Sequence, residues 1–286
     1  MKYERIRIII FIFLLISILP LHAGEFVGGY GGNFLEWGSG ARPIALGQAY
    51  TAIADQGNSI FWNPGGLTQN SGKSIAFMHS VLFADRTFNT IEASVPISSF
   101  TMGIGWQGFQ VTDLEARDAN GQKQGNFNDS ENLFTIGIAT NILSTDMLTL
   151  RTGANGKYFY HSLYNNSATA LGIDLGLHLQ LRLPGIIKYV NFGTAVQNIG
   201  STFSWDTESE YKADIPTTLS AGWAIRTFLL PLTASFDIKK IGERDIIPYM
   251  GLEYDWSVMA FRAGLNDDKV TGGLGIDVPV NKINVS

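Results

Sequence analysis

The chain has 286 residues, of which 45% are hydrophobic and 16% charged, with 32 glycines and no cysteine. This composition is too apolar for a disordered chain, and the lack of cysteine excludes a disulfide framework, a cysteine-based zinc site and a cysteine nucleophile. The formal net charge of −5 argues against a nucleic-acid partner, because no basic stripe is available to displace counterions from phosphates.

Residues 1–23 have the pattern of a secretory signal peptide. Basic residues precede an apolar run over residues 8–19, and cleavage is expected after Ala23. The run is shorter than the ~20 residues of a spanning helix, although an uncleaved inner-membrane anchor is the alternative. A chain exported by this route is periplasmic, secreted or inserted in the outer membrane as a β-barrel.

Residues 24–72 do not follow a strand pattern. They contain 12 glycines in 49 residues, and Pro43 suits the first turn of a short helix. Leu46, Tyr50 and Ile53 recur at helical spacing before Gly57 interrupts the pattern. Because this segment is too short for a core of its own, we expect it to pack inside or at the mouth of a barrel, as a hatch.

From residue 73 onwards the sequence alternates between apolar and polar or glycine residues. Residues 171–182 read LGIDLGLHLQLR, which places five leucines and an isoleucine on one face and Asp174, His178 and glycines on the other. The same division predicts twelve strands, at residues 74–81, 88–96, 99–110, 132–143, 147–161, 168–182, 188–199, 216–228, 231–239, 246–256, 257–266 and 270–279.

A soluble β-sandwich would also show this alternation. The lengths of the connections between the predicted strands distinguish a sandwich from a membrane barrel. The third connection (111–131) and the seventh (200–215) are expected to be long and polar, whereas most even-numbered connections are tight. Short periplasmic turns that alternate with longer external loops are typical of an outer-membrane barrel. We therefore predict an all-β protein, a transmembrane antiparallel β-barrel with twelve visible strands.

The histidines give little support to an enzyme. His79 and His161 each precede a serine in a predicted strand, so the two side chains of each pair point to opposite faces. Asp174 and His178 share a face, but four residues along a strand separate their Cα atoms by roughly 13 Å. No hydrolase, metalloprotease or nucleotide-binding motif occurs. We expect no enzyme, no cofactor and no metal.

Two groups of residues resemble a known family. The first runs from Gly40-Ala41-Arg42 through Ala54-Asp55 to Trp62-Asn63-Pro64-Gly65-Gly66-Leu67, and the second is GLEYDWSVMAFRAGL followed by TGGLGIDV within residues 249–278. Together they resemble the FadL-like outer-membrane proteins, and more closely the PorV/PorQ branch. The resemblance covers essentially the whole chain after residue 23.

This resemblance implies a fourteen-stranded barrel with an amino-terminal hatch, residues 24–72. The barrel would occupy residues 73–286 and would be truncated at the carboxyl end, with about two further strands beyond residue 286. Gly65 stands where the family usually has alanine.

The resemblance also selects site residues. The hatch motif comprises Arg42, Asp55, Trp62, Asn63 and Pro64, and Arg42 and Asp55 could form an ion pair or be solvated. Phe61, Trp62 and Leu67 are weak candidates for ligand contact, because they could equally serve to anchor the hatch.

For function, relatives of FadL pass hydrophobic molecules, whereas relatives of PorV are accessory or shuttle proteins of type IX secretion. We expect a transporter of hydrophobic small molecules in the outer membrane of a diderm bacterium, with the secretion role as the alternative. The expected partners are outer-membrane lipid and either a hydrophobic small molecule or an exported protein.

Overall fold

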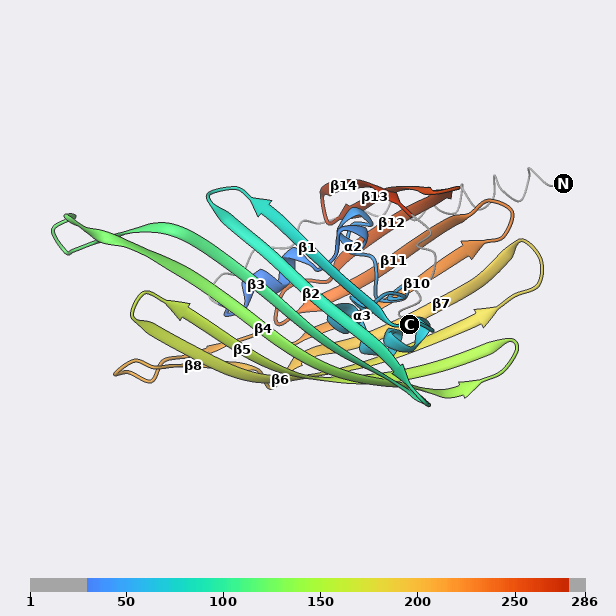
Figure 1. The fold of residues 1–286 in the computed structure, drawn as a ribbon, viewed down its shortest axis with the longest axis horizontal. Coiled ribbons are helices and arrows are strands. Elements are labelled where there is room, and N and C mark those ends of the chain that lie inside the picture. Colours follow the sequence, from blue (N-terminus) through green and yellow to red (C-terminus); the bar gives the residue numbers. More distant parts are fainter. Residues whose placement is uncertain (1–29, 278–286) are drawn as a thin grey trace, which may run out of the picture.

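The computed structural model describes residues 30–277, which form one antiparallel sheet around an inner segment, residues 30–72 (Figure 1). Twelve strands pair in chain order. They are β1 (Ser74–Leu82), β2 (Arg86–Ile97), β3 (Phe100–Arg117), β4 (Lys123–Ser144), β5 (Leu148–Leu163), β6 (Asn166–Arg182), β7 (Ile187–Ile199), β10 (Thr218–Thr227), β11 (Leu232–Ile241), β12 (Ile247–Trp256), β13 (Met259–Asn266) and β14 (Lys269–Ile276). Two short strands, β8 (Thr202–Trp205) and β9 (Lys212–Asp214), complete the fourteen described.

The two faces of the sheet are inverted relative to a soluble protein. Leu171 and Leu175 are 70% and 50% exposed on the outer face, whereas Asp174 and His178 are fully buried on the inner face. A soluble sandwich would bury the leucines and expose the charges. The predicted all-β antiparallel barrel is confirmed, and each of the twelve predicted strands coincides with an observed one.

The predicted connections are partly wrong. Residues 111–131 were expected to form a long loop, but β3 continues to Arg117 and β4 starts at Lys123, so the turn is short. The paired strands absorb a register shift after Val111, where Asp113 has a φ of 57°. No residue from Gln110 to Arg117 is buried. Neither face of the strand therefore needs apolar residues, and the alternation of apolar and polar residues that indicates a strand is absent.

The seventh connection is also more ordered than predicted. It contains β8 and β9, which pair with each other, and β8 pairs with the beginning of β6 at Ala168 and Thr169. These two strands are not the additional strands expected from the resemblance. The predicted signal peptide and the carboxyl-terminal residues 278–286 lie outside the described residues.

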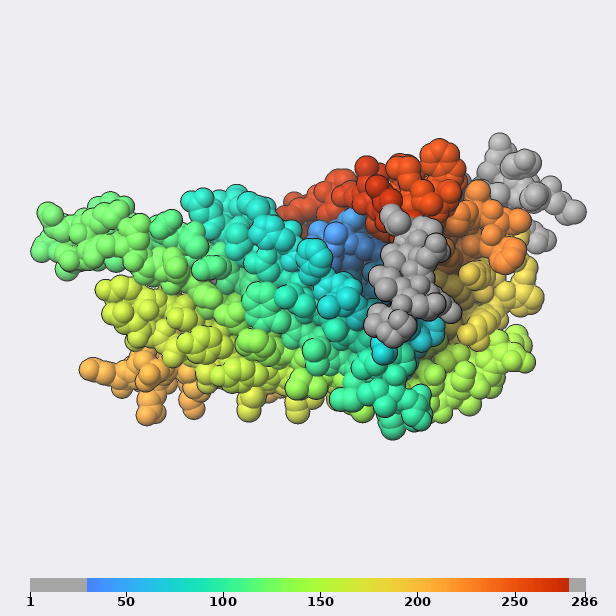
Figure 2. All heavy atoms as spheres, in the orientation of Figure 1, coloured from blue at the N-terminus to red at the C-terminus, as the bar shows by residue number. Residues whose placement is uncertain are grey.

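Strands β1 and β14 are the two edges of the sheet, because no pairing joins them within residues 30–277. The inner segment, in blue, is visible between the edge strands in Figure 2. Near the β14 edge, the backbone N–H of Gly47 donates to Thr271 Oγ1 at 3.0 Å, and that hydroxyl donates to the carbonyl of Ala45 at 3.1 Å.

The inner segment is built from four short helical elements: η1 (Asn33–Trp37), α2 (Ala41–Ala45), α3 (Ser59–Trp62) and η2 (Pro64–Gln69). None of the helices in residues 30–277 has the length and apolar character needed to cross a membrane. Two apolar clusters fill the interior. One lies within α3, η2 and their neighbours, and the other joins Phe34 of η1 to wall residues such as Phe88, Leu133 and Phe159.

Candidate functional site

The inner segment approaches the wall where the wall has glycine. A Cβ at Gly153 would overlap the backbone carbonyl of Pro64, and a Cβ at Gly193 would overlap that of Thr51. A Cβ at Gly264 would overlap Gly47 in the same way. Because these positions lack a side chain, two backbones can pack directly against each other. The glycines on the inner faces of the strands therefore form a seat for the inner segment.

Polar side chains of the wall satisfy the irregular backbone of the inner segment. Asp237 Oδ2 accepts the N–H groups of Tyr50 and Thr51 at 2.9 and 2.8 Å. Asn155 Nδ2 donates to the carbonyl of Ile60 at 2.7 Å, and Gln197 Nε2 donates to that of Phe61 at 2.8 Å. Buried backbone groups without such partners would be costly, so these contacts hold a segment with little regular structure in one place.

Arg42 is bound to the wall through a buried carboxylate. Its Nε and Nη2 atoms each lie 2.7 Å from an oxygen of Glu253, and the Nε atom of Arg262 lies 2.6 Å from Glu253 Oε2. Arg42 Nη1 also contacts Asp55 Oδ1 at 2.5 Å, so Arg42 and Asp55 form an ion pair rather than separate solvated charges. The bidentate geometry fixes α2 against β12.

The charges around Arg42 change its protonation behaviour and that of Tyr50. Burial by itself lowers the pKa of Arg42, but Asp55, Tyr50 and Glu253 outweigh burial and raise that pKa well above its ordinary value. Burial, reinforced by Asp55, raises the pKa of Tyr50 well above its ordinary value. Arg42 therefore stays charged and Tyr50 stays neutral over the physiological range.

Asn63 and Pro64 connect α3 to η2 at the centre of the barrel. Asn63 is fully buried, and its Oδ1 atom accepts the N–H of Gly65 at 3.0 Å. Its Nδ2 atom donates to the carbonyls of Thr51 and Leu177, at 2.9 and 3.0 Å. One side chain thus caps η2, joins two parts of the inner segment and binds β6.

The glycine seat can be tested by adding one methyl group. Gly153→Ala is expected to lower the free energy of unfolding by about 1–3 kcal/mol, because the new Cβ meets backbone rather than a movable side chain. Gly156→Ala, on the same strand with nothing within 4 Å of its Cβ, is the matched control. Denaturant titrations in lipid vesicles would compare the two. Equal effects would contradict direct packing of the inner segment on Gly153.

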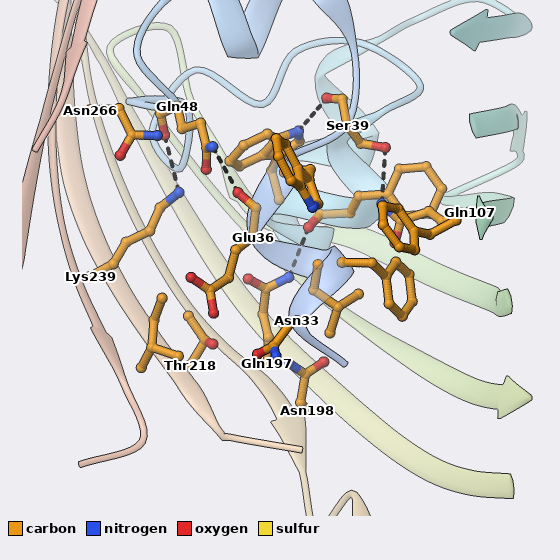
Figure 3. A pocket seen from close by; sticks show the side chains of 18 of the residues that line it. Asn33, Glu36, Ser39, Gln48, Gln107, Gln197, Asn198, Thr218, Lys239 and Asn266 are labelled. Carbon is orange, nitrogen blue, oxygen red and sulfur yellow. Dashed lines mark hydrogen bonds between the residues drawn. The ribbon is translucent and has the colours of Figure 1, made fainter. Parts of the chain in front are cut away.

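A cavity of about 760 Å³ lies inside the barrel next to the inner segment. Its apolar lining includes Phe34, Trp37, Phe61, Trp62 and Phe109, and its polar lining includes the residues labelled in Figure 3. The β11–β12 and β13–β14 connections also line this cavity, at the end of the barrel where the β3–β4 turn lies. The cavity is large enough for a small organic ligand.

Some polar groups around this cavity bind each other. Lys239 Nζ donates to the carbonyl of Gln48 at 3.2 Å and lies 4.5 and 4.4 Å from the ring centres of Trp62 and Tyr249. Gln48 Nε2 in turn donates to the carbonyl of Glu36 at 2.9 Å (Figure 3). These groups bind each other, but the lining also includes Arg86, Asp129 and Asp267, so the cavity presents aromatic rings together with charged side chains.

The structure distributes the residues proposed from sequence between two environments. Phe61 and Trp62 line the cavity, whereas Leu67 is fully buried in the cluster beneath it. Trp62 Nε1 donates to the carbonyl of Ser39 at 2.8 Å, so this ring also anchors the segment. Sequence reasoning missed Lys239, although its alternation with Asp237 on the inner face of β11 was a readable signal.

Asp174 and His178, which share the inner face of β6, bind different partners. His178 Nε2 lies 2.9 Å from the carbonyl of Ala52, and Asp174 Oδ2 lies 2.9 Å from Lys157 Nζ, so each residue binds a separate partner. Within the part of the chain that the structure describes, no group of histidine and acidic residues has the geometry to hold a metal ion.

These features define a class: an antiparallel membrane β-barrel whose lumen holds its own amino-terminal segment below an aromatic cavity. A comparison with family models found no match, and a comparison with curated protein sequences found none. The fold is similar to the crystal structure of the toluene transporter TodX of Pseudomonas putida, with a TM-score of 0.55, 13% identity, and coverage of 85% of this chain and 89% of that chain.

A second solved structure agrees. A mutant of TodX, a monoaromatic hydrocarbon channel, matches with a TM-score of 0.50 and 13% identity over 86% of this chain and 85% of that chain. At this identity the likeness concerns the fold. It supports the FadL-like fold predicted from the sequence, and the PorV/PorQ branch stays a prediction.

Proposed function

We propose that this protein is an outer-membrane channel for small hydrophobic molecules, of the FadL type, and that residues 24–72 act as its hatch. The observation that carries the proposal is the 760 Å³ cavity with its aromatic lining. An apolar solute gains ~0.8 kcal/mol for each methylene that leaves water, so such a cavity would hold it without any charged partner.

The exposed outer face supports a place in a membrane. Large apolar side chains cover it on successive strands, for example Ile104 on β3, Ile136 on β4 and Leu175 on β6. A contiguous apolar surface of this extent is unfavourable in water and favourable against acyl chains. The export signal expected at residues 1–23 fits an outer-membrane location.

The hatch role is supported by the contacts of the inner segment. Its backbone is held by β5, β6, β7 and β11 through the hydrogen bonds described above. A plug bound on several sides blocks free passage of salts, while the cavity beside it can accept a solute. In this proposal Phe61 and Trp62 contact the solute, and Asn63 and Pro64 keep the plug in position.

Uptake by cells tests this function. Thr218 lines the cavity and Leu219, the next residue, is 48% exposed on the outer face. Thr218→Trp should fill part of the cavity and reduce the initial uptake rate of labelled toluene several-fold. Leu219→Trp should leave uptake unchanged, since an aromatic side chain is tolerated on the membrane-facing surface.

The measurement uses a bacterial host without hydrocarbon channels of its own, and equal amounts of folded protein in the outer membrane are confirmed by heat-dependent migration on gels. Equal uptake by the wild type and an empty-vector control would refute the proposal for toluene, and labelled oleate would then test a longer solute. Failure of both solutes, together with capture of exported proteins on the barrel, would move the assignment to the secretion accessory.

A further inference from the structure

A second cavity, of about 460 Å³, lies beside the first and under the β8–β9 hairpin. Asn33 and Glu131 line both cavities, so the two are neighbours across these side chains. The second cavity has different chemistry, because one carboxylate, that of Glu131, lines it together with several aromatic rings.

Two carboxylates stand on the inner face of β4. Asp129 Oδ1 lies 2.7 Å from His161 Nε2, so the carboxylate of Asp129 already has a partner. Glu131 is 9% exposed, and its Oε2 atom has no hydrogen-bond partner among the described residues. His161 Nδ1 lies 4.0 Å from Glu131 Oε2, beyond hydrogen-bond distance. A buried carboxylate oxygen without a donor is costly, so a ligand that brings positive charge to it would be stabilised.

The nearby cation Lys157 is already engaged by other groups. Lys157 lies on the same face of β5 as His161, but its Nζ atom is 2.9 Å from Asp174 Oδ2 and 2.8 Å from Asn198 Oδ1. The ammonium group of Lys157 is therefore committed to a different carboxylate. Glu131, which lines the cavity, keeps one carboxylate oxygen without a hydrogen-bond donor among the described residues.

Aromatic rings complete the wall. The ring of Trp205, on β8, is 4.8 Å from the ring of His161, and the ring of Phe203 is 5.8 Å from it. Tyr30 and Tyr211 also line the cavity. Faces of aromatic rings attract cations, and rings combined with a carboxylate favour an organic ammonium ion over a metal ion, which needs several oxygen or nitrogen ligands.

From this juxtaposition we propose that the cavity under the β8–β9 hairpin is a binding site for an organic cation, an alkyl- or arylammonium ion. The positive nitrogen lies against Glu131, and its alkyl groups contact Trp205 and Tyr211. This site is separate from the cavity proposed for neutral solutes. A cation can bind to it whether or not the protein transports a solute.

Calorimetric titration of the full-length protein in a nonionic detergent tests this site. The probes are benzyltrimethylammonium, the neutral benzyl alcohol and the anion benzoate. We expect saturable binding of the cation and much weaker binding of the other two. Glu131→Gln keeps the shape of the side chain and removes the charge, and it should weaken binding of the cation by at least about tenfold.

Glu115→Gln is the control, because Glu115 is an exposed carboxylate on the β3–β4 hairpin that contacts Arg117 and Lys123. It should bind the cation as the wild type does. Trp205→Leu provides a second variant, which should also weaken binding because it removes a ring face without changing charge.

The proposal is overturned if the wild type does not bind the cation, if benzoate binds equally well, or if Glu131→Gln binds as tightly as the wild type. Equal weakening by Glu115→Gln would also overturn it, since that result would indicate a general charge effect. Toluene uptake by Trp205→Leu, whose side chain lines the second cavity and not the first, distinguishes this site from the channel function. If toluene uptake is normal and the wild type does not bind the cation, the cation site is refuted and the proposed channel function still stands.

Discussion

Glu253→Ala is expected to lower the free energy of unfolding by about 3–5 kcal/mol, because it leaves buried guanidinium groups without their carboxylate. Glu253 is 1% exposed and binds Arg42 of the inner segment at 2.7 Å and Arg262 of β13 at 2.6 Å. The substitution removes the bond between α2 and the wall at the same time. Denaturant titrations of the protein folded in lipid vesicles would measure the loss.

The large loss of stability expected for Glu253→Ala depends on the burial of its carboxylate. The same substitution at an exposed carboxylate is therefore the control. Glu115→Ala removes contacts to Arg117 and Lys123 that are open to solvent, and it should cost less than about 1 kcal/mol. If the two variants lose similar stability, the inner segment is not held by the Arg42–Glu253 pair as the structure shows.

Leu175→Arg should destabilise the folded barrel by about 2–4 kcal/mol, because it places a charge on the membrane-facing surface near the middle of β6. Leu175 is half exposed on the outer face, between neighbours of the same kind at Ile173 and Leu177. In water an arginine at an exposed position would be nearly neutral for stability. Folding titrations in vesicles therefore report directly whether this face meets lipid.

The matched control uses the same substitution near the end of the strand. Leu183 lies in the turn after β6 and is 39% exposed, so Leu183→Arg should cost no more than about 1 kcal/mol. The inner face is unsuitable as a control, because His178 is fully buried and its Nδ1 atom lies 3.2 Å from Arg151. Equal destabilisation by the two leucine substitutions would contradict a depth-dependent membrane environment.

The sequence was sufficient to predict the strands and their faces. Alternation with period two is a local property, so residues 171–182 could be assigned to a strand with an apolar face before any partner was known. The assignment failed between residues 110 and 131, where strand pairing continues into solvent. From residue 110 to residue 130 neither face is buried, so the amino-acid pattern does not indicate a strand there.

The site was predictable to a smaller extent. The motif around Trp62, Asn63 and Pro64 marked a part of the inner segment that contacts the wall through Asn63, and the glycines of the inner faces were visible as a pattern. Their role in packing against the inner segment could not be predicted from the sequence, because the contact of Gly153 with Pro64 depends on how β5 and the inner segment are arranged in the tertiary structure.

The sequence by itself determined which residues share a face of each strand, because that division depends on neighbours two positions away. That the apolar face points outward is seen in the tertiary structure. The tertiary structure decided which inward residues meet. Arg42 and Glu253 are 211 positions apart, and Glu131 and Trp205 share a cavity although they stand on different strands. Such contacts depend on the register of every strand between them and on the curvature of the sheet, which no local pattern specifies.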